Sequence, residues 1–103
     1  MIVEYIRYTV SADESAALIA AYQSAGASLR ASVHCQAFEL TQCSEAPGVF
    51  VLRIVWDSLA GHLQGFRSSP EFRSFFQAVQ PFVGQIDEMR HYEVTQVSWR
   101  REP

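Results

Sequence analysis

The sequence has little positive charge, and none of it is clustered. All eight basic side chains among the 103 residues are arginines scattered along the chain, and the formal net charge is -3. A protein that binds nucleic acid by neutralising phosphates concentrates Lys and Arg on one surface. The composition therefore argues against a nucleic-acid partner.

Long apolar runs are missing as well. No stretch approaches the roughly 18 consecutive apolar residues of a membrane-spanning helix. Glu4 and Arg7 interrupt the apolar N-terminal stretch, so it is unlike a signal peptide. We therefore expect no membrane partner and a cytoplasmic location. Repeats, linkers and low-complexity segments are absent, and 103 residues suit one domain.

Metal-binding patterns are not evident. The two cysteines, Cys35 and Cys43, match no metal spacing and no CxxC motif, and we expect them to be reduced thiols. His34, His62 and His91 lie far apart in the sequence, and no two of them share a predicted helical face. The sequence therefore predicts no metal site.

Alternation of apolar side chains predicts four strands. The predicted strands span residues 2–10, 33–41, 49–56 and 88–99. On the first strand the alternation places Ile2, Glu4, Ile6 and Tyr8 on one face, with Val3 starting the other. The strands carry apolar residues on both faces, so we expect both faces of the sheet to be covered.

Two helical regions separate these strands. A capping-box pattern from Ser11 to Glu14 predicts a helix that runs to about Leu29. Asp57 or Ser58 is expected to cap a second helical segment. The Ser69-Pro70-Glu71 run predicts another helix start, and Pro81 limits that helix.

The element order is β-α-β-β-α-β, with the second helical unit split in two. This order predicts an α+β, ferredoxin-like fold, in which helices cover one face of an antiparallel sheet. Because both faces carry apolar residues and helices cover only one, we expect a homodimer whose two sheets pack face to face.

The stretch from Trp56 to Tyr92 carries the candidate site. Four residues, Leu59, His62, Leu63 and Phe66, follow helical spacing and are expected to share one inward arc. The next helix repeats the pattern with Phe72, Phe75, Phe76 and Val79. An imidazole held against aromatic rings suits a pocket for a flat, oxidisable organic molecule.

The same stretch resembles the antibiotic biosynthesis monooxygenase (ABM) family. The resemblance is carried by Trp56, by His62 six residues later, by Phe66-Arg67-x-Ser69-Pro70, by the Phe-rich helix, and by Pro81-Phe82 and 89–92. It implies an ABM-like domain over residues 1–103 that forms a dimeric α/β barrel. It also implies oxidation of a quinol, anthrone or similar phenol by O2, without a metal, flavin or other cofactor.

The resemblance implies roles for six residues. His62 is the candidate base, because imidazole titrates near neutral pH, and Arg67 is the candidate group that stabilises an anion. Four aromatic residues are expected to hold the substrate ring: Trp56, Phe66, Phe76 and Tyr92. His91 alternates with Tyr92 on the last predicted strand, so at most one of the two faces a given pocket.

Other readings stay open at this point. Arg67 could instead pair with Glu71, four residues later. The protein could be a non-catalytic dimeric module that binds a small aromatic ligand, or a domain whose pocket is filled by side chains. A haem-degrading relative is disfavoured, because the resemblance would then call for an Asn on the first strand and a wider Trp-to-His spacing.

Overall fold

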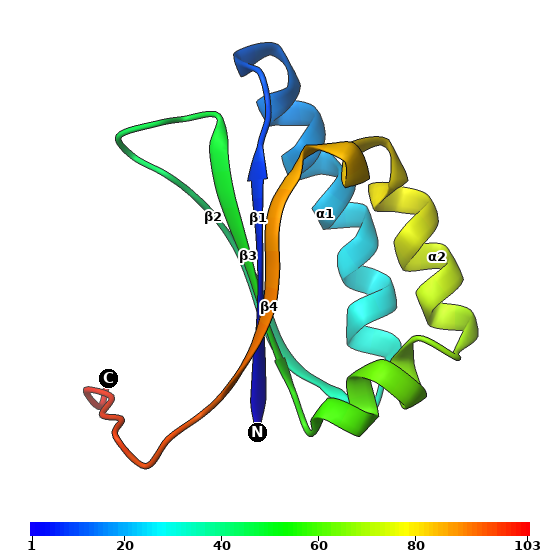
Figure 1. Ribbon diagram of the computed structural model, residues 1–103, viewed down its shortest axis with the longest axis vertical. Coiled ribbons are helices and arrows are strands. Elements are labelled where there is room, and N and C mark those ends of the chain that lie inside the picture. The colour runs from blue at the N-terminus through cyan, green and yellow to red at the C-terminus, as the bar shows by residue number, and fades with distance from the viewer.

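Four antiparallel strands and two main helices build the molecule, which a computed structural model describes over residues 1–103. The strands are β1 (Ile2–Thr9), β2 (Cys35–Gln42), β3 (Val49–Trp56) and β4 (Ile86–Glu93), and the helices are α1 (Ser15–Ala31) and α2 (Pro70–Val79). The strand order is β2-β3-β1-β4. Both helices cover the same face of the sheet, and the other face is uncovered (Figure 1). The predicted α+β, ferredoxin-like fold is therefore confirmed.

The helices begin where their capping residues predict. The Glu14 carboxylate accepts hydrogen bonds from the backbone N–H and the hydroxyl of Ser11, and this turn is a short 3-10 helix that leads into α1. At α2, the Ser69 hydroxyl accepts from the backbone N–H of Phe72, and Pro70 follows as the first helical residue. Pro81 lies in a 3-10 segment, Gln80–Gln85, which connects α2 to β4.

The segment between β3 and α2 differs from the expected α-helix. Residues Gly61–Phe66 form a π-helical turn, in which the N–H of Arg67 donates to the carbonyl of His62, five residues earlier, at 3.1 Å. A π-helical turn holds more residues than an α-helical one. His62 and Phe66 are therefore buried, whereas Leu59 and Leu63 are 43% and 41% exposed. The prediction of a single inward arc was wrong for these two leucines.

The last strand is shorter than predicted. β4 ends at Glu93 rather than at residue 99, because Glu93 pairs with Ile2, the first residue of its partner strand β1. Beyond Val94, whose N–H donates to the carbonyl of Met1, no strand remains to satisfy the backbone. The C-terminal tail extends away from the sheet (Figure 1) and leaves Trp99 exposed.

The two faces of the sheet differ in what covers them. The face toward the helices is deeply buried: Phe50, Leu52, Ile54 and Trp56 of β3 are each at most 1% exposed. On the open face, Tyr5 and Val51 are partly exposed and Tyr92 is 47% exposed. None of the helices is long and apolar enough to cross a membrane.

Candidate active site

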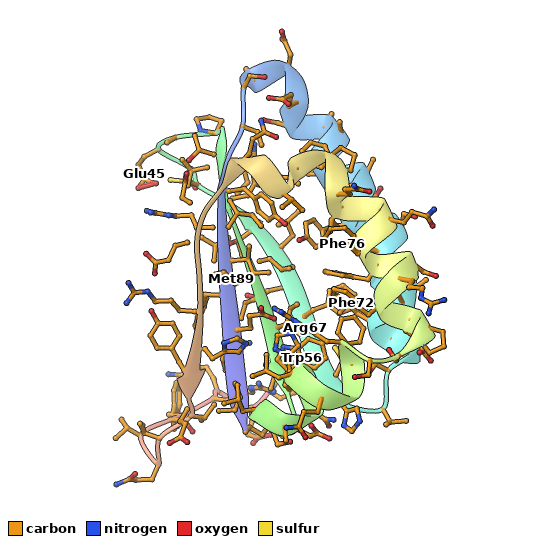
Figure 2. All side chains as sticks on the ribbon, turned by 45° about the vertical axis from the view of Figure 1, so that its right-hand side comes forward. Glu45, Trp56, Arg67, Phe72, Phe76 and Met89 are labelled. Carbon is orange, nitrogen blue, oxygen red and sulfur yellow. The ribbon has the colours of Figure 1, made fainter.

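A mainly apolar cavity of about 210 Å³ lies between the sheet and α2. Thirteen of its sixteen lining residues are hydrophobic, and the other three are Glu4, His62 and Arg67. Trp56 and Arg67 lie near one end of the space between sheet and helix, and Phe72 and Phe76 project into it from α2 (Figure 2). An apolar cavity of about 150 Å³ can hold benzene, so this one has room for a somewhat larger ring system. The alternative of a pocket filled by side chains is therefore not observed.

Glu4 is the buried acid of the cavity wall. Its place on β1, between Ile2 and Ile6, turns the carboxylate toward the helices, and the residue is only 2% exposed. The indole Nε1–H of Trp56 donates to Glu4 Oε1 at 3.1 Å. Burial raises the pKa of Glu4 above its usual 4.5, while the Trp56 hydrogen bond and the charge of Arg67 act in the opposite direction.

His62 lies beside this carboxylate on the π-helical turn. The residue is 3% exposed, and its ring stacks on Trp56 with centroids 4.4 Å apart and planes 9° from parallel. Its Nε2 is 3.5 Å from Glu4 Oε1. Burial, followed by the charges of Arg67 and His91, lowers the pKa of His62 to about 4. The imidazole is therefore neutral at pH 7 and keeps an electron pair that can accept a proton.

His91 completes a contiguous network with these two residues. It lies directly opposite Glu4 in the pairing of β1 with β4. Its Nε2 is 2.8 Å from Nδ1 of His62 and 3.8 Å from Oε2 of Glu4. Burial and the charge of Arg67 both lower the pKa of His91. The fold thus brings together two histidines that are 29 residues apart in the sequence.

Glu4 and His91 are not among the predicted site residues. His62 and His91 are far apart in the sequence but 2.8 Å apart in the structure, so sequence distance does not exclude a shared metal site. Glu4 left a signal, because it is the one charged residue on the apolar face of the first strand. The position of His91 relative to Glu4 depends on strand register, which the sequence does not reveal. His34 lies apart and pairs through Nδ1 with Oδ2 of Asp57 at 2.9 Å.

Arg67 is the cationic residue of the cavity. It is exposed at the C-terminal end of the π-helical turn, and its side chain also lines the cavity. It makes no ion pair, so the alternative of an Arg67–Glu71 pair is not observed. Its charge is available to an anion in the cavity, and it already lowers the pKa of Glu4, His62 and His91.

Three of the four predicted ring-binding residues line the cavity, namely Trp56, Phe66 and Phe76. The structure does not bring Tyr92 to them. Tyr92 pairs with Val3 across β1 and β4, on the open face of the sheet, and its ring packs edge-on against Tyr5 with centroids 5.5 Å apart. Alternation along β4 turns His91 toward the helices and Tyr92 away from them, as the sequence analysis expected for the two.

A second hollow lies between α1 and the β2 side of the sheet. It is larger, at about 420 Å³, and nine residues line it, among them Phe38 and Leu40. Arg30 is its one charged residue, and its guanidinium lies over the Phe38 ring. No carboxyl or imidazole group lines this second cavity, so we identify the cavity beside Glu4 and His62 as the candidate active site.

Comparison with known proteins identifies the family of the chain. Residues 1–78 match the family described as antibiotic biosynthesis monooxygenase. The chain belongs to this family. No curated protein sequence matches it. Family membership supports a monooxygenase-type function and leaves the substrate open.

Solved structures of the ABM family share the fold at low sequence identity. A provisionally named antibiotic biosynthesis monooxygenase from Bordetella bronchiseptica is 21% identical, with a TM-score of 0.79 over 91% of this chain and 96% of its own. SnoaB from Streptomyces nogalater, described as a cofactor-independent oxygenase, is 13% identical, with a TM-score of 0.77 over 93% and 94%. A provisionally named family member from Chloroflexus aurantiacus is 17% identical, with a TM-score of 0.75 over 95% and 96%.

Proposed function

We propose that the protein is a cofactor-independent monooxygenase that oxidises a quinol, anthrone or similar aromatic phenol with O2. The observation that carries the proposal is the Glu4–His62 pair, which lines an apolar cavity together with the unpaired cation of Arg67. Such a reaction needs an enclosed ring site, a proton acceptor, and a positive charge near the oxygen that becomes anionic.

The chemistry requires no electron donor other than the substrate. Loss of a proton converts the phenol to a phenolate, which can pass one electron to O2. The resulting radical pair combines to a peroxide at ring carbon. The proton on that carbon leaves as the O–O bond breaks, so one oxygen stays on the ring as a carbonyl group and the other leaves as water. The substrate supplies all four electrons that reduce O2.

We assign the base to the Glu4–His62 pair rather than to His62 alone. Burial raises the pKa of the carboxyl and lowers the pKa of the imidazole to about 4, so the carboxylate is the more basic partner. Both side chains line the cavity and lie 3.5 Å apart, so a proton taken by either can be shared. His91 lies behind His62 and positions its ring through the 2.8 Å contact.

The remaining residues bind the ring and its charge. The stacked Trp56 and the neighbouring Phe66 and Phe76 provide apolar walls for a flat molecule. Arg67 stabilises the phenolate and the peroxide anion, because its side chain lines the cavity and makes no ion pair with a carboxylate. Tyr92 has no role here, because it lies on the other face of the sheet.

We also propose that two copies pair through their open sheet faces. Tyr5, Val51 and Tyr92 form a partly exposed apolar surface there, and no helix covers it. A second copy would remove this surface from water, which is favourable in proportion to the apolar area buried.

Oxygen uptake tests the proposal. With a naphthoquinol and an anthrone as substrates, we expect uptake that depends on the protein and persists after chelator treatment. Glu4→Gln and His62→Ala should each lower kcat by at least about 100-fold, the usual contribution of a positioned base. Gln77→Ala serves as the control, because Gln77 is exposed on α2 and does not line the cavity.

Two results would contradict the proposal. One is the absence of protein-dependent uptake across a panel of quinols, anthrones and naphthols. The other is equal loss of activity in Gln77→Ala and His62→Ala. Thermal stabilisation by such a ring compound without turnover would instead identify the alternative, a dimeric module that binds a small aromatic ligand.

A further inference from the structure

Glu4, His62 and His91 meet the requirements of a metal site. One ligand atom from each residue lies within 4.8 Å of the other two. Two imidazoles and one carboxylate form the ligand set of many catalytic zinc sites and of non-haem iron oxygenases. The three residues come from β1, the π-helical turn and β4, so three separate elements of the fold fix their positions.

The spacing of these atoms suits a single small ion. A single ion takes one nitrogen from each imidazole: His91 Nε2 is 2.8 Å from His62 Nδ1 and 3.8 Å from Glu4 Oε2, and the ligand atoms of the three residues lie within 4.8 Å of one another. Ligand atoms at the usual 2.0–2.2 Å from zinc lie about 3 to 3.5 Å from one another. Both contacts of His91 Nε2 are therefore within about an ångström of the spacing that zinc requires.

The surroundings resemble those of a metal-binding carboxylate. The Trp56 Nε1–H holds Oε1 of Glu4 at 3.1 Å, and no hydrogen bond reaches Oε2. Outer hydrogen bonds of this kind orient ligating carboxylates. Glu4 and His62 also line the cavity, so an ion between them would have a coordination position open to a bound molecule.

We propose that Glu4, His62 and His91 bind a divalent transition-metal ion, for which Zn2+ is the most direct probe. Such an ion would take up the electron pairs with which Glu4 and His62 accept a proton. If the proposed function holds, metal binding and the metal-free base exclude each other, and Zn2+ inhibits turnover.

Calorimetric titration of chelator-treated protein with Zn2+ tests the site directly. We expect one ion per chain, a raised melting temperature, and at least about tenfold weaker binding in His91→Gln and Glu4→Gln. His91 is partly exposed, so His91→Gln should fold, which circular dichroism can verify. Substitution of Co2+ for Zn2+ should give a visible absorption spectrum in the wild type. The two variants should not show this spectrum.

Two controls separate this cluster from other zinc ligands. His34→Gln removes the other surface imidazole, and Cys35→Ser with Cys43→Ser removes the two free thiols. Both controls should bind Zn2+ as the wild type does. The proposal is overturned if Zn2+ does not bind, if His91→Gln binds it as tightly as the wild type, or if either control abolishes binding.

Activity measurements test the metal-site proposal and the proposed function separately. Turnover by metal-free protein, with Zn2+ inhibition that weakens at least tenfold in His91→Gln, supports both. Binding of Zn2+ together with turnover that requires added Fe2+ supports the metal site and overturns the cofactor-independent reaction. Turnover without any Zn2+ binding overturns the metal site alone.

Discussion

At the scale of single residues, the buried carboxylate of Glu4 is the feature that most needs a functional explanation. A carboxylate that is 2% exposed loses most of its hydration, and one indole hydrogen bond and a nearby arginine compensate only in part. The pKa of Glu4 is raised because the cost of desolvation exceeds what the Trp56 hydrogen bond and the Arg67 charge offset. Groups with such shifts concentrate at functional sites, where stability is lost in exchange for reactivity.

Glu4→Gln should therefore separate stability from activity. The amide oxygen can still accept the Trp56 hydrogen bond, and no charge remains to be desolvated. Because the pKa of Glu4 is raised in the folded state, its ionisation opposes folding at pH 7. The free energy of unfolding of Glu4→Gln in urea should equal or exceed that of the wild type, while turnover is lost. Clear destabilisation would show that the carboxylate is structural.

His62 should make the stability depend on pH. Its pKa is lowered from 6.5 in the unfolded chain to about 4 in the folded protein. Between these values the unfolded chain binds a proton that the folded state does not. The free energy of unfolding should therefore fall as the pH is lowered through this window, by up to about 3 kcal/mol for a shift of this size.

Urea unfolding at pH 7 and pH 4 measures this effect. The comparison is made between Glu4→Gln and the double variant Glu4→Gln/His62→Gln, so that the Glu4 carboxyl does not titrate. We expect the stability advantage of the histidine-containing protein to shrink toward pH 4. An advantage that is independent of pH would mean that His62 is hydrated in the folded state.

The site residues that were predicted from the sequence contact residues close to them along the chain. Those that were not predicted make contacts between distant parts of the chain. His62, Trp56 and Phe66 are close in the sequence and became neighbours in the structure. Glu4 and His91 meet them through the pairing of β1 with β3 and β4, across 52 and 29 residues. Periodicity reports the face of a residue but not the register of its strand, so these contacts were not predictable.

At the scale of elements, the π-helical turn Gly61–Phe66 is the local structure that the sequence analysis did not predict. Its spacing suits an α-helix equally well, so the choice between them depends on tertiary contacts. The His34 ring packs against this turn, where a Cβ on Gly65 would overlap the imidazole, and a Cβ on Gly61 would overlap the Asp57 carboxylate. Two glycines therefore allow the close approach that positions His62.

Gly65→Ala should destabilise the protein and displace the turn. Overpacking of this kind costs about 1–3 kcal/mol, and a displaced turn moves His62 from Glu4, so turnover should fall too. Gly84→Ala is the matched control, because a Cβ there meets nothing within 4 Å. Urea unfolding of both variants checks the prediction.

The His34 ring provides a second check on the cause. If its contact with Gly65 is responsible, His34→Ala should restore part of the stability that Gly65→Ala loses, as a coupling between the two sites. Equal losses in Gly65→Ala and Gly84→Ala would contradict the account and point to a general cost of alanine in these turns.

At the scale of the whole molecule, the uncovered sheet face indicates what the monomer lacks. The sequence predicted apolar residues on both faces of the sheet, and the structure shows helices on only one (Figure 1). The open face also carries Arg7 and Glu88 beside Tyr5, Val51 and Tyr92, so it combines apolar contact area with charges of both signs. That mixture is typical of an interface between subunits.

Val51→Arg should separate the proposed dimer. Val51 lies opposite Arg7 in the pairing of β1 with β3, so the substitution adds a second positive charge at this point of the open face. Two facing copies would then bury like charges, which is costly without counterions. We expect sedimentation of the wild type at twice the chain mass of 11.6 kDa and of the variant at the chain mass.

Gln77→Arg, on the exposed side of α2, adds the same charge elsewhere and should remain dimeric. A wild type that sediments as a monomer, or a Val51→Arg protein that stays dimeric, would exclude the open sheet face as the interface.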